Sequence, residues 1–69
     1  MHFRSIRKTN HYREHHEKDV PWSEVIEAIL TTKNPRKKEN KIEIKNNKYY
    51  ILCKLENNIL WVINAKHTK

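Results

Sequence analysis

Apolar and polar residues alternate through residues 41–45, 48–56 and 59–67, and an Asn-Asn pair separates each segment from the next. Alternation with a period of two is typical of half-buried strands, and two-residue Asn loops between such segments indicate hairpins. The pattern therefore predicts a three-stranded antiparallel meander, in which Lys45 pairs with Lys48 and Glu56 pairs with Ile59.

Counting outward from the two turns assigns every strand residue to a core face or an open face. The core face receives Ile42, Ile44, Tyr49, Ile51, Cys53, Leu55, Leu60 and Val62. The open face receives Lys41, Glu43, Lys45, Tyr50, Leu52, Lys54, Trp61, Ile63, Ala65 and His67. This register pairs Lys54 with Trp61 and Tyr50 with Ala65. It puts Lys66 on the core side, unless a β-bulge intervenes.

A helix is predicted over residues 19–30, where Asp19 and Pro21 supply a start signal and Asn34-Pro35 prevents continuation beyond residues 31–33. Glu24 and Glu27 fall on its outer side. Its apolar stripe at helical spacing consists of Trp22, Val25, Ile26, Ile29 and Leu30.

A second, more polar helix is predicted over residues 11–18, with Thr9 or Asn10 as its cap. Tyr12, with His15 or His16, faces inward from it. Residues 2–7 form either an extended lead-in or an edge strand. The predicted architecture is α+β: residues 1–69 make a single domain with two helices on one face of the meander and the other face open.

The single cysteine excludes an intrachain disulfide and suits a reducing cytoplasm. The first ten residues are too polar for a secretory signal, and no apolar stretch reaches the about 18 residues of a membrane span. We therefore expect a cytoplasmic protein without a membrane partner. The absence of glycine excludes the Gly-rich phosphate loops of nucleotide-binding proteins.

The net charge is +7, and the densest basic stretch is residues 33–41. Arg36, Lys37 and Lys38 lie there in a predicted Pro-containing loop, where they could contact phosphates. A solvated loop that keeps the protein soluble is the alternative interpretation.

On the open face, the aromatic rings of Tyr50 and Trp61 could stack on unpaired bases while Lys54 holds a phosphate. The alternative is that Trp61, Leu52 and Ile63 form a homodimer interface, or that the amino-terminal segment covers them.

Residues 11–15 match the H-x-x-E-H pattern of one class of zinc proteases. No second acidic segment supplies a third ligand, and 69 residues are too few to build a substrate cleft. We therefore expect no metal and no cofactor. Cys53 is expected to be an unreactive buried thiol.

The order helix, helix, meander resembles a family of small prokaryotic domains related to the BrnT-type and RelE-type toxins. The resemblance rests on His11 at the first helix, on residues 16–25 around the start of the second helix, and on the closing segment 61–67. It covers about residues 9 to 67.

The resemblance implies an RNA-directed, metal-independent endoribonuclease that a partner antitoxin neutralises. Among the catalytic candidates, Lys66 matches the basic residue of the toxin closing strand, and His16 matches the histidine before the second helix. Chemistry adds His67, since histidine exchanges protons near neutral pH, and Arg13, since arginine binds phosphate. A non-catalytic module that binds nucleic acid or protein is the alternative.

Overall fold

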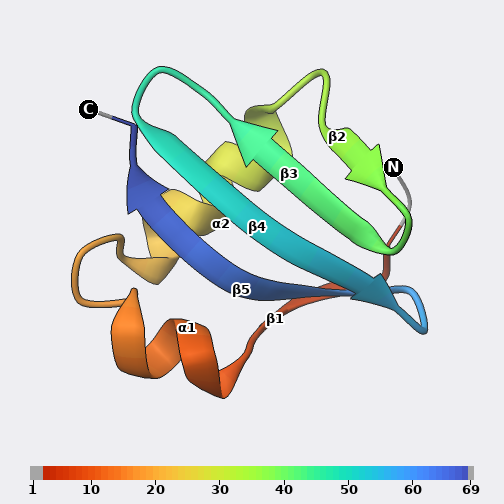
Figure 1. Ribbon diagram of the computed structural model, residues 1–69, viewed down its shortest axis with the longest axis horizontal. Helices are drawn as coiled ribbons and strands as arrows, with labels where there is room; N and C mark the ends of the chain where they lie inside the picture. The colour runs from red at the N-terminus through yellow and green to blue at the C-terminus, as the bar shows by residue number, and fades with distance from the viewer. Residues whose placement is uncertain (1–2, 69) are drawn as a thin grey trace.

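The computed structural model describes residues 3–68, which form a five-stranded sheet with two helices against one of its faces (Figure 1). The elements in chain order are β1 (Ser5–Lys8), α1 (Asn10–His15), α2 (Trp22–Thr31), β2 (Arg36–Lys38), β3 (Lys41–Lys45), β4 (Tyr49–Glu56) and β5 (Ile59–His67). The spatial order of the strands is β1-β5-β4-β3-β2. Neither helix is long and apolar enough to cross a bilayer, as far as the described part of the chain goes.

The α+β class and the central β3–β4–β5 meander agree with the sequence prediction, but the sheet has two further strands. The edge-strand alternative for the amino-terminal segment is correct for Ser5–Lys8, which pairs in parallel with β5, while residue 2 lies outside the described residues. The predicted basic loop contains β2, which pairs with β3 across a tight turn in which Glu39 has φ 56°. Three adjacent cations without alternation gave no strand signal there.

The β4–β5 hairpin has the predicted two-residue turn. Asn57 and Asn58 have φ values of 55° and 63°, and Glu56 pairs with Ile59. Asn accepts this left-handed conformation better than most residues, which suits a type I′ turn.

The β3–β4 connection differs from the prediction, because Lys45 pairs with Tyr50 instead of Lys48. The Asn46 side-chain oxygen accepts hydrogen bonds from the backbone N–H groups of Lys48 and Tyr49, at 2.8 and 2.7 Å. This local bonding favours a longer loop over a two-residue turn. The register error is two residues, so the faces assigned to β3 and β4 remain correct.

Helix α1 is shorter than the predicted 11–18 segment. The Thr9 hydroxyl caps its start by accepting from the Tyr12 N–H, and Tyr12 is fully buried as predicted. Helix α2 buries Val25, Ala28 and Ile29 against the sheet. Leu30 was predicted to face the core, but it is 66% exposed near the end of the helix.

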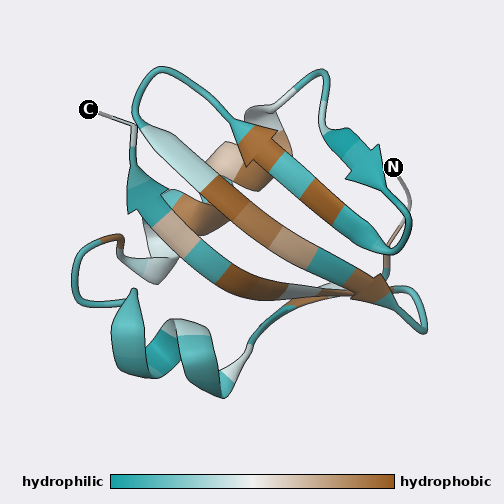
Figure 2. Cartoon of the chain, viewed as in Figure 1, coloured by the Kyte–Doolittle hydropathy of each residue, from teal (hydrophilic) through white to brown (hydrophobic). Residues whose placement is uncertain are grey.

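The core lies between the helices and one face of the sheet. Figure 2 shows the apolar residues of the strands as brown bands. Ile42, Ile44, Ile51, Leu60 and Val62 are all buried as predicted. Cys53 is buried as well, and burial raises its pKa to about 12, so the thiol is kept protonated and unreactive.

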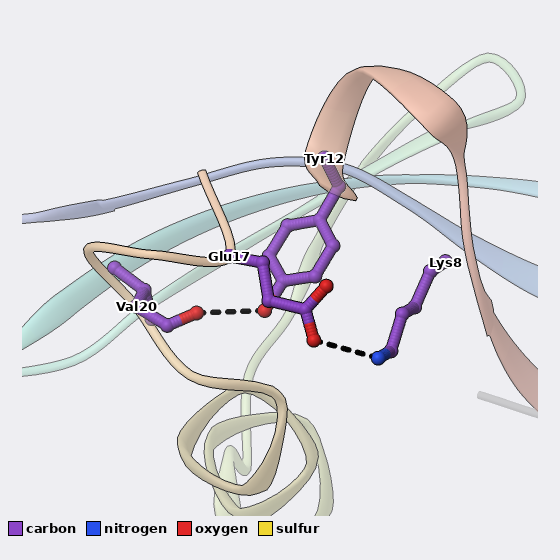
Figure 3. A network of polar contacts seen from close by, with 4 residues as sticks. All are labelled: Lys8, Tyr12, Glu17 and Val20. Atoms are coloured by element: carbon purple, nitrogen blue, oxygen red, sulfur yellow. Dashed lines mark hydrogen bonds and ion pairs between the residues drawn. The ribbon is translucent and has the colours of Figure 1, made fainter. Parts of the chain in front are cut away.

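A polar network fixes the turn between the helices (Figure 3). The buried Tyr12 hydroxyl donates to the Val20 carbonyl at 2.6 Å, and Lys8 Nζ lies 2.6 Å from a Glu17 carboxylate oxygen. The same ammonium lies 5.2 Å from the centre of the Trp22 ring. These contacts hold the turn between the helices against α1 and the end of β1.

Strand β5 contains a β-bulge that changes the predicted faces. Leu52 pairs with Asn64 and Cys53 with Val62, which leaves Ile63 without a partner. A regular register would bury Lys66 and expose Ala65, and burying an unpaired charge is costly. With the bulge, Ala65 is buried and Lys66 pairs with Tyr50. The sides and the Tyr50–Ala65 pair predicted from a regular register are therefore wrong, whereas the bulge alternative is correct for Lys66.

Candidate nucleic-acid interface

Four cations and one aromatic ring form a line across the open face of the sheet. The registers join Lys38 to Lys41, Lys41 to Lys54, Lys54 to Trp61 and Trp61 to Arg7, so all five strands contribute. Adjacent strands lie about 4.8 Å apart, so this basic row spans roughly 19 Å. Its length and charge suit several backbone phosphates of an extended nucleic acid.

The predicted Lys54–Trp61 pair is present in the basic row, whereas Arg7 was not among the residues predicted from the sequence. Arg7 is exposed and lies opposite Trp61 in the parallel ladder. The sequence indicates Arg7 through the alternation of residues 5–8, but four residues are too few to assign each side chain to a face of the sheet. Lys37 pairs with the buried Ile42, so its side chain starts from the other face of the sheet.

A hollow of about 420 Å³ lies beside β2 and β3. Its lining residues are Asn34, Arg36, Glu43, Lys45 and Tyr50. The Tyr50 hydroxyl donates a short hydrogen bond to a Glu43 carboxylate oxygen. This bond and partial desolvation raise the pKa of Tyr50, so the phenol remains the donor. We call this depression the β2–β3 hollow.

A second hollow, of about 300 Å³, lies at the end of β5 and shares two residues with the first. Its lining residues are Lys45, Tyr50, Lys66, His67 and Thr68. Lys66 Nζ lies 5.3 Å from the centre of the Tyr50 ring, within the range of a cation–π contact. Lys45, Tyr50 and Lys66 reach the β5-end hollow from the open face, whereas His67 starts from the opposite face and lines the hollow at the end of the strand.

His67 is oriented by the turn between the two helices. Its Nε2 lies 3.1 Å from the Asp19 backbone carbonyl, and its ring centre lies 5.3 Å from that of Tyr49. A carbonyl oxygen only accepts, so Nε2 must carry the hydrogen in this contact. In neutral His67 the Nδ1 atom is therefore an unprotonated acceptor, as a general base requires.

The other two catalytic candidates lie on α1 and at its C-cap, and neither lines this hollow. Arg13 is exposed, and His16 is half-buried, with its Nε2 enclosed and without a hydrogen-bond partner in residues 3–68. The His16 ring lies 5.1 Å from that of His11, which in turn lies 4.8 Å from His15. Within the described residues, no group of three or more metal-binding side chains is placed to hold an ion.

The structure thus places Lys66, His67 and Tyr50 around one hollow, and Lys54 and Trp61 in a neighbouring row. It leaves Arg13 on α1 and His16 at the C-cap of that helix. Lys45 completes the β5-end hollow and was not a sequence candidate. The loop between β3 and β4 determines where Lys45 lies, and the sequence predicted the wrong partner for Lys45 at this loop.

Comparison with solved structures identifies a protein of the same architecture. A chain in the crystal structure of the toxin–antitoxin complex RelBE2 from Mycobacterium tuberculosis matches with a TM-score of 0.64 and 17% identity, over 97% of this chain and 93% of that chain. The fold is RelE-like. No family model and no curated protein matches the sequence. The RelE-like fold confirms the structural part of the resemblance seen in the sequence, whereas the likeness to BrnT-type toxins stays a prediction.

Proposed function

We propose that this RelE-like domain is a metal-independent endoribonuclease of the toxin type. The observation that carries the proposal is that Lys45, Lys66 and His67 all line one hollow at the end of β5. The β5-end hollow lies about four residues along the strands from the basic row, a distance of roughly 13 Å. A few nucleotides of extended RNA span this distance. A strand bound along the row therefore reaches a base and two cations.

The reaction that these groups suit uses the RNA 2′-hydroxyl as the nucleophile. His67 Nδ1 takes the hydroxyl proton as the O2′–P bond forms, and the Lys45 and Lys66 ammonium groups stabilise the charged phosphorane. The P–O5′ bond then breaks, and the leaving oxygen takes a proton from Lys66 or water. The products are a 2′,3′-cyclic phosphate and a 5′-hydroxyl, and no metal is needed.

The test is incubation of a single-stranded RNA with the purified protein in EDTA. We expect cleavage with a 2′,3′-cyclic phosphate end, and a rate at least about 100-fold lower for His67→Ala, as for the loss of a general base. Lys66→Ala should also slow the reaction. His15→Ala, an exposed histidine on α1, is the matched control and should cleave at the wild-type rate.

Uncut RNA with wild-type protein, or an unchanged rate in His67→Ala, would overturn the proposed mechanism. Arg13→Ala and His16→Ala belong in the same assay, because the resemblance and phosphate chemistry named these two residues. If RNA is bound but not cut, the protein is a non-catalytic RNA-binding module.

We also propose an antitoxin-like protein as the partner, since the matched fold comes from a toxin–antitoxin complex. Expression of the domain alone should slow bacterial growth, and co-expression of the partner should restore it. The homodimer alternative predicts instead that the isolated domain elutes as a dimer in size-exclusion chromatography. The Trp61→Ala variant should then elute at a lower apparent mass.

A further inference from the structure

The β2–β3 hollow is not used by the proposed cleavage chemistry, although it shares Lys45 and Tyr50 with the β5-end hollow. Its volume of about 420 Å³ lies within the usual range for small-molecule sites, about 300–1,000 Å³. Because the two hollows share a wall, a nucleotide seated in one lies next to a phosphate seated in the other.

Two charged groups in this hollow face each other without forming an ion pair. Arg36 and Glu43 are direct cross-strand partners, a geometry in which opposite charges usually interact. The two ion pairs found in residues 3–68 are Lys8–Glu17 and Lys54–Glu56, so Arg36 and Glu43 both remain available. Tyr50 holds one Glu43 oxygen, but a carboxylate offers about four acceptor positions.

We propose that the β2–β3 hollow binds a guanine base of the RNA, adjacent to the phosphate that is cleaved. Guanine carries two neighbouring donors, N1–H and the N2 amino group, that match the two oxygens of one carboxylate. Its O6 and N7 acceptors lie on the adjacent edge, where an arginine binds them in two-point fashion. Glu43 and Arg36 supply this pair of partners.

The other bases fit the same pair less well. Adenine and cytosine each present one amino group, uracil presents one N–H, and only guanine presents two adjacent donors together with two acceptors. The choice of base therefore depends on Glu43, whose carboxylate is oriented by Tyr50. This inference rests on the proposed RNA-directed function, but it concerns recognition and can be measured without cleavage.

The experiment uses eight-nucleotide oligo-uridine RNAs with 2′-O-methyl groups, which block the nucleophile and prevent cutting. One central position is guanosine, inosine or adenosine, and fluorescence anisotropy gives the affinity at fixed salt. We expect the wild-type protein to prefer guanosine over adenosine about tenfold, with inosine, which lacks the N2 amino group, in between.

Glu43→Gln should reduce the guanosine-to-adenosine ratio to about one while retaining the affinity for the adenosine RNA. Glu27→Gln, an exposed acid on α2, is the matched control and should keep the tenfold ratio. Arg36→Gln, on the edge strand, provides a second variant that should lower the same ratio if Glu43→Gln does not fold.

Equal affinities for the three RNAs, or a preference that survives in folded Glu43→Gln, would overturn the guanine assignment and leave the cleavage proposal standing. The absence of binding to any of the RNAs would overturn both. Base preference with native RNA left uncut would support the guanine assignment and reject only the enzyme.

Discussion

Single side chains near the end of β5 depend on groups from distant segments. His67 is oriented by the Asp19 carbonyl, and Lys66 is placed against the Tyr50 ring. The residue types could be read from the sequence, because histidine and lysine carry recognisable chemistry. Their neighbours could not be read, since the contacts depend on the helix–helix turn and on the β-bulge. The buried positions were easier, because apolar alternation marks them directly.

Cys53 makes the stability depend on pH. Burial raises its pKa from 9.0 to about 12, so the folded protein holds a proton that the unfolded chain releases. Its contribution is complete below pH 9 and is lost as the pH rises from 9 to 12, at up to about 1.4 kcal/mol per pH unit.

Urea unfolding at pH 8 and pH 10 tests this dependence. We expect the wild-type protein to lose about 1 kcal/mol more than Cys53→Ala between these values. The variant will be less stable at both, because a cavity replaces the sulfur. The same loss in both proteins would show that Cys53 is not responsible. Tyr12 adds to this loss of stability only above pH 10, because burial raises the pKa of its hydroxyl to about 12.

At the level of elements, strands with clear alternation and helices with an apolar stripe were predictable. β3, β4, β5 and α2 all lie close to their predicted ranges. β2 was not predictable, because its three basic residues show no alternation and its position depends on pairing with β3 at the edge of the sheet. The sequence offered the bulge only as an alternative, because the choice between the two registers depends on which of Ala65 and Lys66 is buried.

The two Asn-Asn pairs should respond differently to glycine. Asn58 has φ 63°, and the Asn-Gly pair is favoured in type I′ turns, so Asn58→Gly should stabilise the protein by about 0.5 kcal/mol. Asn47 does not have a positive φ, so Asn47→Gly should give no gain. Thermal unfolding compares the two variants, and an equal response would contradict the assigned turn geometries.

At the level of the whole molecule, basic side chains concentrate on the open face of the sheet, and most acidic side chains lie in the helical layer. The open face carries seven basic side chains, Arg7, Arg36, Lys38, Lys41, Lys45, Lys54 and Lys66, against the acids Glu43 and Glu56. Five of the remaining acids lie in α1, α2 or the turn between them. A field of this kind guides a polyanion toward the open face. The net charge was evident from the sequence, but its division between faces needed the registers.

RNA binding should therefore depend steeply on salt. Four phosphate contacts along the basic row predict a slope of about −3 in a plot of log K against log salt, since each contact to single strands contributes about 0.7. The double variant Lys41→Ala, Lys54→Ala should reduce the slope by about half. Lys18→Ala, in the turn between the helices, is the control, and a reduction of the same size there would argue against the row.

Because Ile63 has no partner in the sheet, we expect β5 to tolerate the deletion of this one residue. Loss of that codon would restore regular pairing and leave Asn64, Ala65, Lys66 and His67 on the sides that they now occupy. A homologue one residue shorter at this point would thus present an equivalent surface, although its alternation would look different. Alignments of such chains should match residues 64–67 from the carboxyl end and place the gap at Ile63.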